Sequence, residues 1–167
     1  RLRSRGLGYV YKRQLNSPCG TVRVTDGIIT YVGENRISHE KPGYKVLDAR
    51  GNVLLPGFVD SHTHLVFGGF RPDEFIWRLN GDSYMSIMER GGGIINTVRA
   101  TREASFEELK HKAEWFLDTM SRMGVTTVEG KSGYGLDRDT ELKQLSVMQA
   151  INECPDRNCL LYTSPSP

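Results

Sequence analysis

The sequence has few of the features that mark exported, membrane-spanning or disulfide-rich proteins. It contains only three cysteines in 167 residues, a sparse and odd count that argues against a disulfide scaffold and favours a reducing compartment. Its longest apolar run, residues 53–59, is broken by Pro56 and Gly57 and is too short to span a membrane. The arginine-rich start is followed by no apolar segment, unlike a signal peptide. We therefore expect a cytoplasmic protein with no membrane partner.

An excess of charge of one sign is also lacking. The formal net charge is +2, and the basic excess is concentrated in the first 13 residues. A basic arm can contact phosphates, but no helix pattern or aromatic platform follows it that would make nucleic-acid binding specific. We expect no nucleic-acid partner. The apolar fraction of 38% and the charged fraction of 25% are those of an ordinary globular protein.

The two ends of the sequence differ from its middle. Residues 1–14 show no periodicity, and residues 160–167 (LLYTSPSP) are a Ser/Pro-containing run that follows a helical pattern abruptly. Both resemble translated sequencing-adapter ends, so we expect non-native tails at 1–14 and 160–167. The alternative is ordinary flexible termini.

The residues before position 51 have the pattern of a small β element. β-Branched and polar residues alternate from Thr21 to Val32 around Asp26-Gly27, which predicts a hairpin. Residues 45–48 could form another short strand before Gly51. We assign residues 15–50 to this β region.

Strand and helix patterns then alternate, which is typical of a parallel α/β protein. The apolar residues 53–59 predict a strand buried on both faces, and residues 125–128 predict a second buried strand. A helix starting at Ser105, with Glu108 at capping-box spacing, precedes the second strand and stops at Gly124. A further helix follows it. Its apolar residues are Leu142, Leu145, Met148 and Ile151.

Two shorter helices are expected between these strands. One is capped by Asp82 or Ser83 and ends before Gly91, and the other is capped by Asn96 and runs toward Arg102.

His62 and His64 follow the first apolar strand directly. Side chains two apart on a strand share a face, so both imidazoles can point to one place. The carboxyl ends of parallel barrel strands line active sites, and neutral imidazole suits Zn or Fe. The pair predicts a site for one divalent metal, although solvent-exposed histidines at this spacing are also common.

Several motifs together resemble one enzyme family. Residues 55–64 (LPGFVDSHTH) resemble the first-strand signature of the amidohydrolase superfamily, in which both histidines bind the catalytic metal. Four further segments resemble the imidazolonepropionase family: 64–71 (HLVFGGFR), 91–94 (GGGI), 97–102 (TVRATR) and 131–136 (KSGYGL). The resemblance implies that residues 51–159 are the first βα units of a TIM-type (β/α)8 barrel, preceded by part of a β-sandwich.

The resemblance also implies a reaction. Members of the family hydrolyse the cyclic amide of 4-imidazolone-5-propanoate to N-formimidoyl-L-glutamate in histidine degradation. Arg71 could grip the carboxylate tail of this small-molecule substrate, or form a surface ion pair. Tyr134 matches a substrate-binding position of the family, although a tyrosine there could also be loop packing. Residues 91–93 could be a mobile cover, a place of close backbone approach or a plain linker.

The family takes a third histidine, an aspartate and its proton-transfer groups from later strands, and no histidine follows Tyr134 here. His39 and His111 are expected in a loop and on a helix surface. We therefore expect an N-terminal fragment that is itself inactive, from an enzyme that could be a homodimer when complete. Another amidohydrolase, such as a nucleobase deaminase, and a non-catalytic binding module remain as alternatives.

Overall fold

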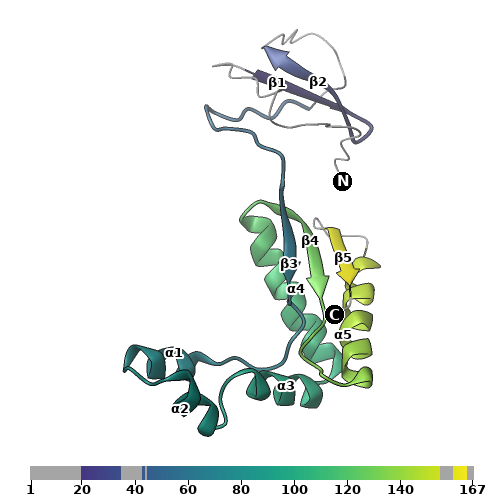
Figure 1. Cartoon of the computed structure of the whole chain (residues 1–167). Coiled ribbons are helices and arrows are strands. Elements are labelled where there is room, and N and C mark those ends of the chain that lie inside the picture. The colour runs from purple at the N-terminus through teal and green to yellow at the C-terminus, as the bar shows by residue number, and fades with distance from the viewer. Residues whose placement is uncertain (1–19, 35–42, 44, 155–159, 165–167) are drawn as a thin grey trace. The chain divides into compact units, whose positions relative to one another are not determined.

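The computed structural model describes residues 20–34, 43, 45–154 and 160–164, which form a mixed α/β protein (Figure 1). The chain divides into two compact units, residues 1–54 and residues 55–167. The predicted α/β class is confirmed by this mixture of helices and strands. The predicted tail at 1–14 and the loop residue His39 lie outside the described residues.

The first unit contains the predicted β-hairpin. Strands β1 (Gly20–Thr25) and β2 (Ile28–Glu34) pair antiparallel. The two turn residues, Asp26 and Gly27, have φ values of 50° and 75°, the left-handed pair that a two-residue type I′ hairpin turn requires. The Asp-Gly signal is therefore confirmed.

The short strand predicted at residues 45–48 is wrong, because this segment is not a strand in the structure. Val46 and Leu47 are 65% and 83% exposed. A strand needs a hydrogen-bonding partner and a surface for its apolar face, and no described strand pairs with this segment.

The second unit contains a parallel sheet in the order β3-β4-β5. Its strands are β3 (Phe58–Thr63), β4 (Val125–Lys131) and β5 (Leu160–Ser164), and their arrowheads point the same way in Figure 1. Strand β5 lies within the segment predicted to be a non-native tail. The origin of that segment stays a prediction, while its backbone forms the third strand.

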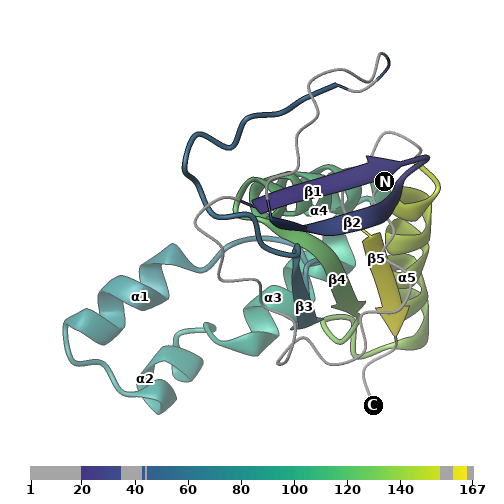
Figure 2. The same cartoon turned by 90° about the horizontal axis from the view of Figure 1, so that it is seen from above.

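Three short helices follow β3 before the longer α4. They are α1 (Pro72–Leu79), α2 (Tyr84–Glu89) and α3 (Ile94–Glu103), and α1 and α2 project away from the sheet (Figures 1 and 2). Ser83 caps α2 as predicted, because its hydroxyl accepts from the Ser86 N–H. Helix α1 was not predicted from the sequence. The α3 cap predicted at Asn96 is wrong, since Gly93 is the cap and Asn96 lies in the first turn.

Helices α4 (Phe106–Arg122) and α5 (Arg138–Asn152) complete the βαβαβ order. The predicted capping box is confirmed: the Ser105 hydroxyl accepts from the Glu108 N–H, and the Glu108 carboxylate accepts from the Ser105 N–H. Hydrogen bonds to the Glu108 carboxylate, first from the Ser105 hydroxyl and second from the Ser105 N–H, hold the pKa of Glu108 below its usual value. The stop at Gly124 is also confirmed by its φ of 92°.

The core of this unit joins α4 and α5 to the sheet around Val128, which is fully buried. It is apolar and includes Leu65, Val66, Leu109, Ala113, Leu117, Val147, Met148 and Ile151. No helix in the described part of the chain is long and apolar enough to cross a membrane.

Two predictions of burial are corrected. The strand predicted at residues 53–59 begins only at Phe58, and Phe58 and Val59 are 55% and 68% exposed because β3 is an edge strand of the described sheet. On α5, Leu142 is 49% exposed, whereas Gln144 is fully buried. Met148 and Ile151 are buried as predicted, but the buried face is turned toward Gln144 and away from Leu142.

Candidate metal centre

Strand β3 is irregular where it carries the histidines. Asp60 is paired with Val128 and Thr63 with Gly130, so β3 has one more residue than β4 in this interval. The Asp60 carboxylate also accepts from the His62 N–H at 3.1 Å. A bulge re-aims side chains, so the simple alternation assumed from the sequence does not hold through His62.

The two histidines nevertheless lie close together. Their ring centroids are 5.2 Å apart in an edge-to-face arrangement. The Nδ1 atom of His64 is buried and has no hydrogen-bond partner among the described residues. Because a buried imidazole nitrogen normally has a partner, this atom fits a metal ligand or a substrate contact.

The histidine pair alone does not complete a metal site. No group of three or more His, Cys, Asp or Glu side chains suited to a metal occurs in the described segments. His111 lies on α4 and is exposed, as predicted. A structural or catalytic zinc site uses at least three protein ligands, so further ligands would have to come from other residues.

Tyr134 joins the histidine pair, although it is 70 positions from His64 in the sequence. It lies in the loop after β4, and its ring centroid is 5.4 Å from that of His64 and 5.8 Å from that of Phe67. Parallel pairing of β3 and β4 brings the two strand ends to the same edge of the sheet. The structure thus places His62, His64 and Tyr134 in one cluster.

The segment after His64 is packed against α4 by aromatic rings and a lysine. Phe67 stacks on Phe116 with centroids 5.6 Å apart. The Lys112 ammonium lies 3.7 Å from the centroids of both Phe67 and Phe70 and donates to the Gly69 carbonyl. Burial lowers the pKa of Lys112 to about 8, because a partly dry environment disfavours its charged form.

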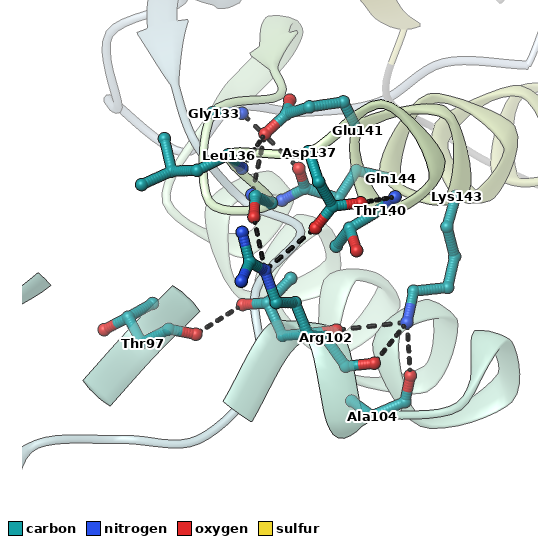
Figure 3. Close-up of polar contacts among 12 residues, drawn as sticks. Thr97, Arg102, Ala104, Gly133, Leu136, Asp137, Thr140, Glu141, Lys143 and Gln144 are labelled. Atoms are coloured by element: carbon teal, nitrogen blue, oxygen red, sulfur yellow. Dashed lines mark hydrogen bonds and ion pairs between the residues drawn. The ribbon is translucent and has the colours of Figure 1, made fainter. Parts of the chain in front are cut away.

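The loop that carries Tyr134 is held by hydrogen bonds from side chains of two helices, α5 and α3 (Figure 3). The Glu141 carboxylate accepts from the N–H groups of Gly135 and Leu136 at 2.7 and 3.0 Å. From α3, the Arg102 Nε atom donates to the Gly135 carbonyl at 2.8 Å and pairs with Asp137 at 2.8 Å. These bonds fix the loop although Leu136 has a left-handed φ of 54°.

Arg71 has a different partner from the ring cluster. Its Nη1 atom pairs with the Glu74 carboxylate at 3.0 Å across the first turn of α1. The other oxygen of Glu74 accepts from the Gly93 N–H at 2.7 Å. Glu74 therefore connects the arginine to the glycine run.

The glycine run is a place of close backbone approach. Gly92 and Gly93 are buried. A Cβ atom at Gly92 would overlap Ile87 and Glu74, and one at Gly93 would overlap Met88, at a φ of 77°. Of the three interpretations left open by the sequence, the close approach is the one that this geometry supports.

Several residues that organise this region were not predicted from the sequence. Glu74, Lys112 and Gln144 act through backbone groups or rings far away in sequence, which no local pattern reveals. Gln144 did leave a signal, because it lies four residues before Met148 and seven before Ile151, on the same helical face. A polar residue in that stripe indicates a buried polar contact.

No family model matches the chain, whereas curated proteins match it closely. It is 91% identical over 157 residues to the imidazolonepropionase of Phocaeicola vulgatus, an alignment that covers 94% of this chain and 38% of the relative. It is 65% identical over 137 residues to that of Bacteroides thetaiotaomicron, covering 80% of this chain and 33% of the relative. For Clostridium tetani the identity is 57% over 136 residues, covering 80% and 32%.

These similarities confirm the family resemblance found in the motifs. The chain spans about a third to two fifths of the length of the curated relatives it matches, 32% to 38% in these three. The sequence is thus similar to one segment of a longer enzyme.

Proposed function

We propose that this chain, a segment similar to imidazolonepropionases, belongs to an enzyme that hydrolyses 4-imidazolone-5-propanoate to N-formimidoyl-L-glutamate in histidine degradation. The observation that carries the proposal is the 91% identity, over 94% of the chain, to a relative of that name. The close arrangement of His62, His64 and Tyr134 supports it independently.

His62 and His64 would hold one divalent metal, either Zn or Fe. The buried Nδ1 of His64, which has no hydrogen-bond partner in the part of the chain that the structure describes, supports this role, and both metals accept imidazole. When bound, the metal would supply a coordinated water that is more acidic than bulk water and would polarise the ring carbonyl. The remaining ligands, a histidine and an aspartate by family resemblance, and the proton-transfer groups would come from outside this chain.

The chain's own residues would bind and orient the substrate. The Tyr134 hydroxyl can donate a hydrogen bond to the ring or to the carboxylate. Arg71 can bind the carboxylate tail, because a guanidinium has five N–H donors and the Glu74 pair is made through Nη1. Glu74 would then hold the arginine in a fixed orientation.

The finer architecture is also part of the proposal. Residues 51–159 would form the first βα units of a TIM-type barrel, and residues 15–50 would form part of a β-sandwich. The parallel pairing of β3 with β4, with α4 between them in the chain and α5 after them, supports the barrel. Residues 1–14 and 160–167 would be non-native, and the complete enzyme would be cytoplasmic and homodimeric.

Product analysis with the purified full-length protein tests this function. We expect N-formimidoyl-L-glutamate from 4-imidazolone-5-propanoate and no ammonia from nucleobases. Ammonia release from a nucleobase without ring opening of the imidazolone would favour a deaminase. A folded protein that turns over neither compound, even after Zn or Fe is added, would favour a non-catalytic role.

A further inference from the structure

Gln144 is a polar side chain in an apolar core. It lies on α5 in the same buried face as Val147, Met148 and Ile151, and its exposed fraction is 0%. Burying an amide without hydrogen bonds is unfavourable. Its hydrogen-bond partners therefore determine what it does in this position.

Both ends of the Gln144 amide bond to the main chain. Nε2 donates to the Val66 carbonyl at 2.7 Å, and Oε1 accepts from the Gly133 N–H at 3.4 Å. The Val66 carbonyl accepts and the Gly133 N–H donates. If the amide were rotated by half a turn, its NH2 group would face the Gly133 N–H and its oxygen would face the Val66 carbonyl. The orientation of the side chain is fixed by this complementarity.

The two main-chain partners belong to the segments that carry the candidate site. Val66 is two residues after His64, and Gly133, labelled in Figure 3, directly precedes Tyr134 in the loop between β4 and α5. The rings of His64 and Tyr134 lie 5.4 Å apart. The bonds from Glu141 and Arg102 to this loop are made further along, at Gly135 and Leu136.

We propose that Gln144 is a positioning residue that fixes His64 and Tyr134 relative to one another by bonding the backbone of both segments. Its role in catalysis rests on the proposed function, in which His64 binds metal and Tyr134 binds substrate. The backbone bridge itself does not depend on that function.

Substitution of Gln144 in the full-length protein tests the proposal. Gln144→Met keeps the volume and removes both hydrogen bonds. We expect kcat for ring opening to fall about 10- to 100-fold, as for small displacements of catalytic groups, and the metal affinity to fall about tenfold or more. Gln149→Met, on the exposed face of the same helix, is the matched control and should change neither.

A conservative variant separates hydrogen bonding from packing. In a fully buried position the carboxyl of Gln144→Glu is expected to stay protonated, so that it can donate to Val66 and accept from Gly133. It should recover most of the activity lost in Gln144→Met. If Gln144→Met does not fold, Gln144→Asn keeps an amide that is one methylene too short to bond both partners, and we expect the same losses.

A readout without metal or substrate makes the two proposals separable. In the metal-free wild-type protein, selectively labelled for NMR, we expect a nuclear Overhauser contact between the rings of His64 and Tyr134, and its loss in Gln144→Met. A wild type that keeps this contact but opens no imidazolone ring would contradict the proposed function alone. A folded Gln144→Met protein with unchanged ring contact, metal affinity and kcat would overturn the role of Gln144.

Discussion

The Tyr134 side chain has two separable parts, a ring and a hydroxyl. The ring packs near His64 and Phe67, whereas in the proposed reaction the hydroxyl bonds the substrate. Packing and binding can therefore be tested by a change that removes only one of them.

We expect Tyr134→Phe in the full-length enzyme to lower kcat/KM about tenfold or less, because one neutral hydrogen bond contributes about 0.5–1.5 kcal/mol. The metal content should not change. Steady-state kinetics of ring opening with metal analysis measures both. Tyr84→Phe, at an exposed position on α2, is the control, and equal kcat/KM in all three proteins would remove Tyr134 from the site.

Lys112 gives the stability a pH dependence with a defined sign. Burial lowers its pKa from 10.5 to about 8 in the folded protein. Between these values the unfolded chain binds more protons, so stability rises with pH. The gain in the free energy of unfolding from the neutral form of Lys112 is fully present above pH 10.5 and is lost as the pH falls through about 8.

Urea unfolding of the full-length protein between pH 7.5 and 10 should show this rise, and Lys112→Met should reduce it. Lys110→Met is the matched control on the same helix, because the pKa of Lys110 is raised by Glu114 and so does not contribute to the rise. An equal pH dependence in wild type and Lys112→Met would show that Lys112 is not the responsible group.

At the scale of elements, the segment after β3 is held against α3 by close backbone contact. The Gly68 N–H donates to the buried Thr101 hydroxyl at 2.9 Å, and that hydroxyl donates to the Thr97 carbonyl at 2.7 Å. A Cβ atom at Gly68 would overlap the backbone of Ala100. Helix α3 therefore helps to place the residues that follow His64.

We expect Gly68→Ala to destabilise the full-length protein by about 1–3 kcal/mol, the usual cost of overpacking, and to weaken metal binding. Gly20→Ala is the control, since its Cβ would meet only an ordinary contact at 3.7 Å. Denaturant unfolding compares the two. A Gly68→Ala protein as stable as the control would mean that the loop and α3 are not in firm contact.

Elements that depend on contacts between residues near in sequence were predicted well. Elements that depend on packing between distant residues were not. The Asp26-Gly27 turn and the Ser105–Glu108 capping box are contacts within a few residues, and both are confirmed. The burial of residues 53–59 depends on neighbouring strands, which the edge position of β3 does not provide. Helix α3 begins earlier than predicted, after Gly93, because the Gly93 N–H donates to Glu74, 19 residues away.

The candidate site divides in the same way. The histidine pair could be proposed from its place at the end of a predicted parallel strand, whereas the role of Tyr134 was implied by the family resemblance. The β-bulge beside His62 could not be predicted from the sequence, since the register of a strand depends on its partner strand. A surface ion pair of Arg71 was an open alternative from the sequence, and the structure shows such a pair, with Glu74.

At the scale of the whole molecule, the described sheet leaves much apolar surface uncovered. Leu55, Phe58 and Val59 are each more than half exposed. An edge strand with exposed apolar side chains favours association.

We therefore expect residues 1–167 alone to unfold without a cooperative thermal transition and to show no hydrolytic activity. Differential scanning calorimetry of this chain, with the full-length protein as the control, tests the first point. A sharp transition together with ring-opening activity in the isolated chain would contradict the expectation.

The central claim is that His62 and His64 hold the metal with which the complete enzyme opens the imidazolone ring. The most direct measurement is the rate of 4-imidazolone-5-propanoate hydrolysis by the full-length protein. The rate is measured on the protein as purified, after metal removal by a chelator, and after readdition of Zn or Fe. The same series is run on His62→Ala and on His111→Ala, which is the control. We predict that activity is lost on chelation, returns with metal in the wild type and in His111→Ala, and does not return in His62→Ala. Undiminished hydrolysis by the metal-stripped protein, or full recovery in His62→Ala, would contradict the claim.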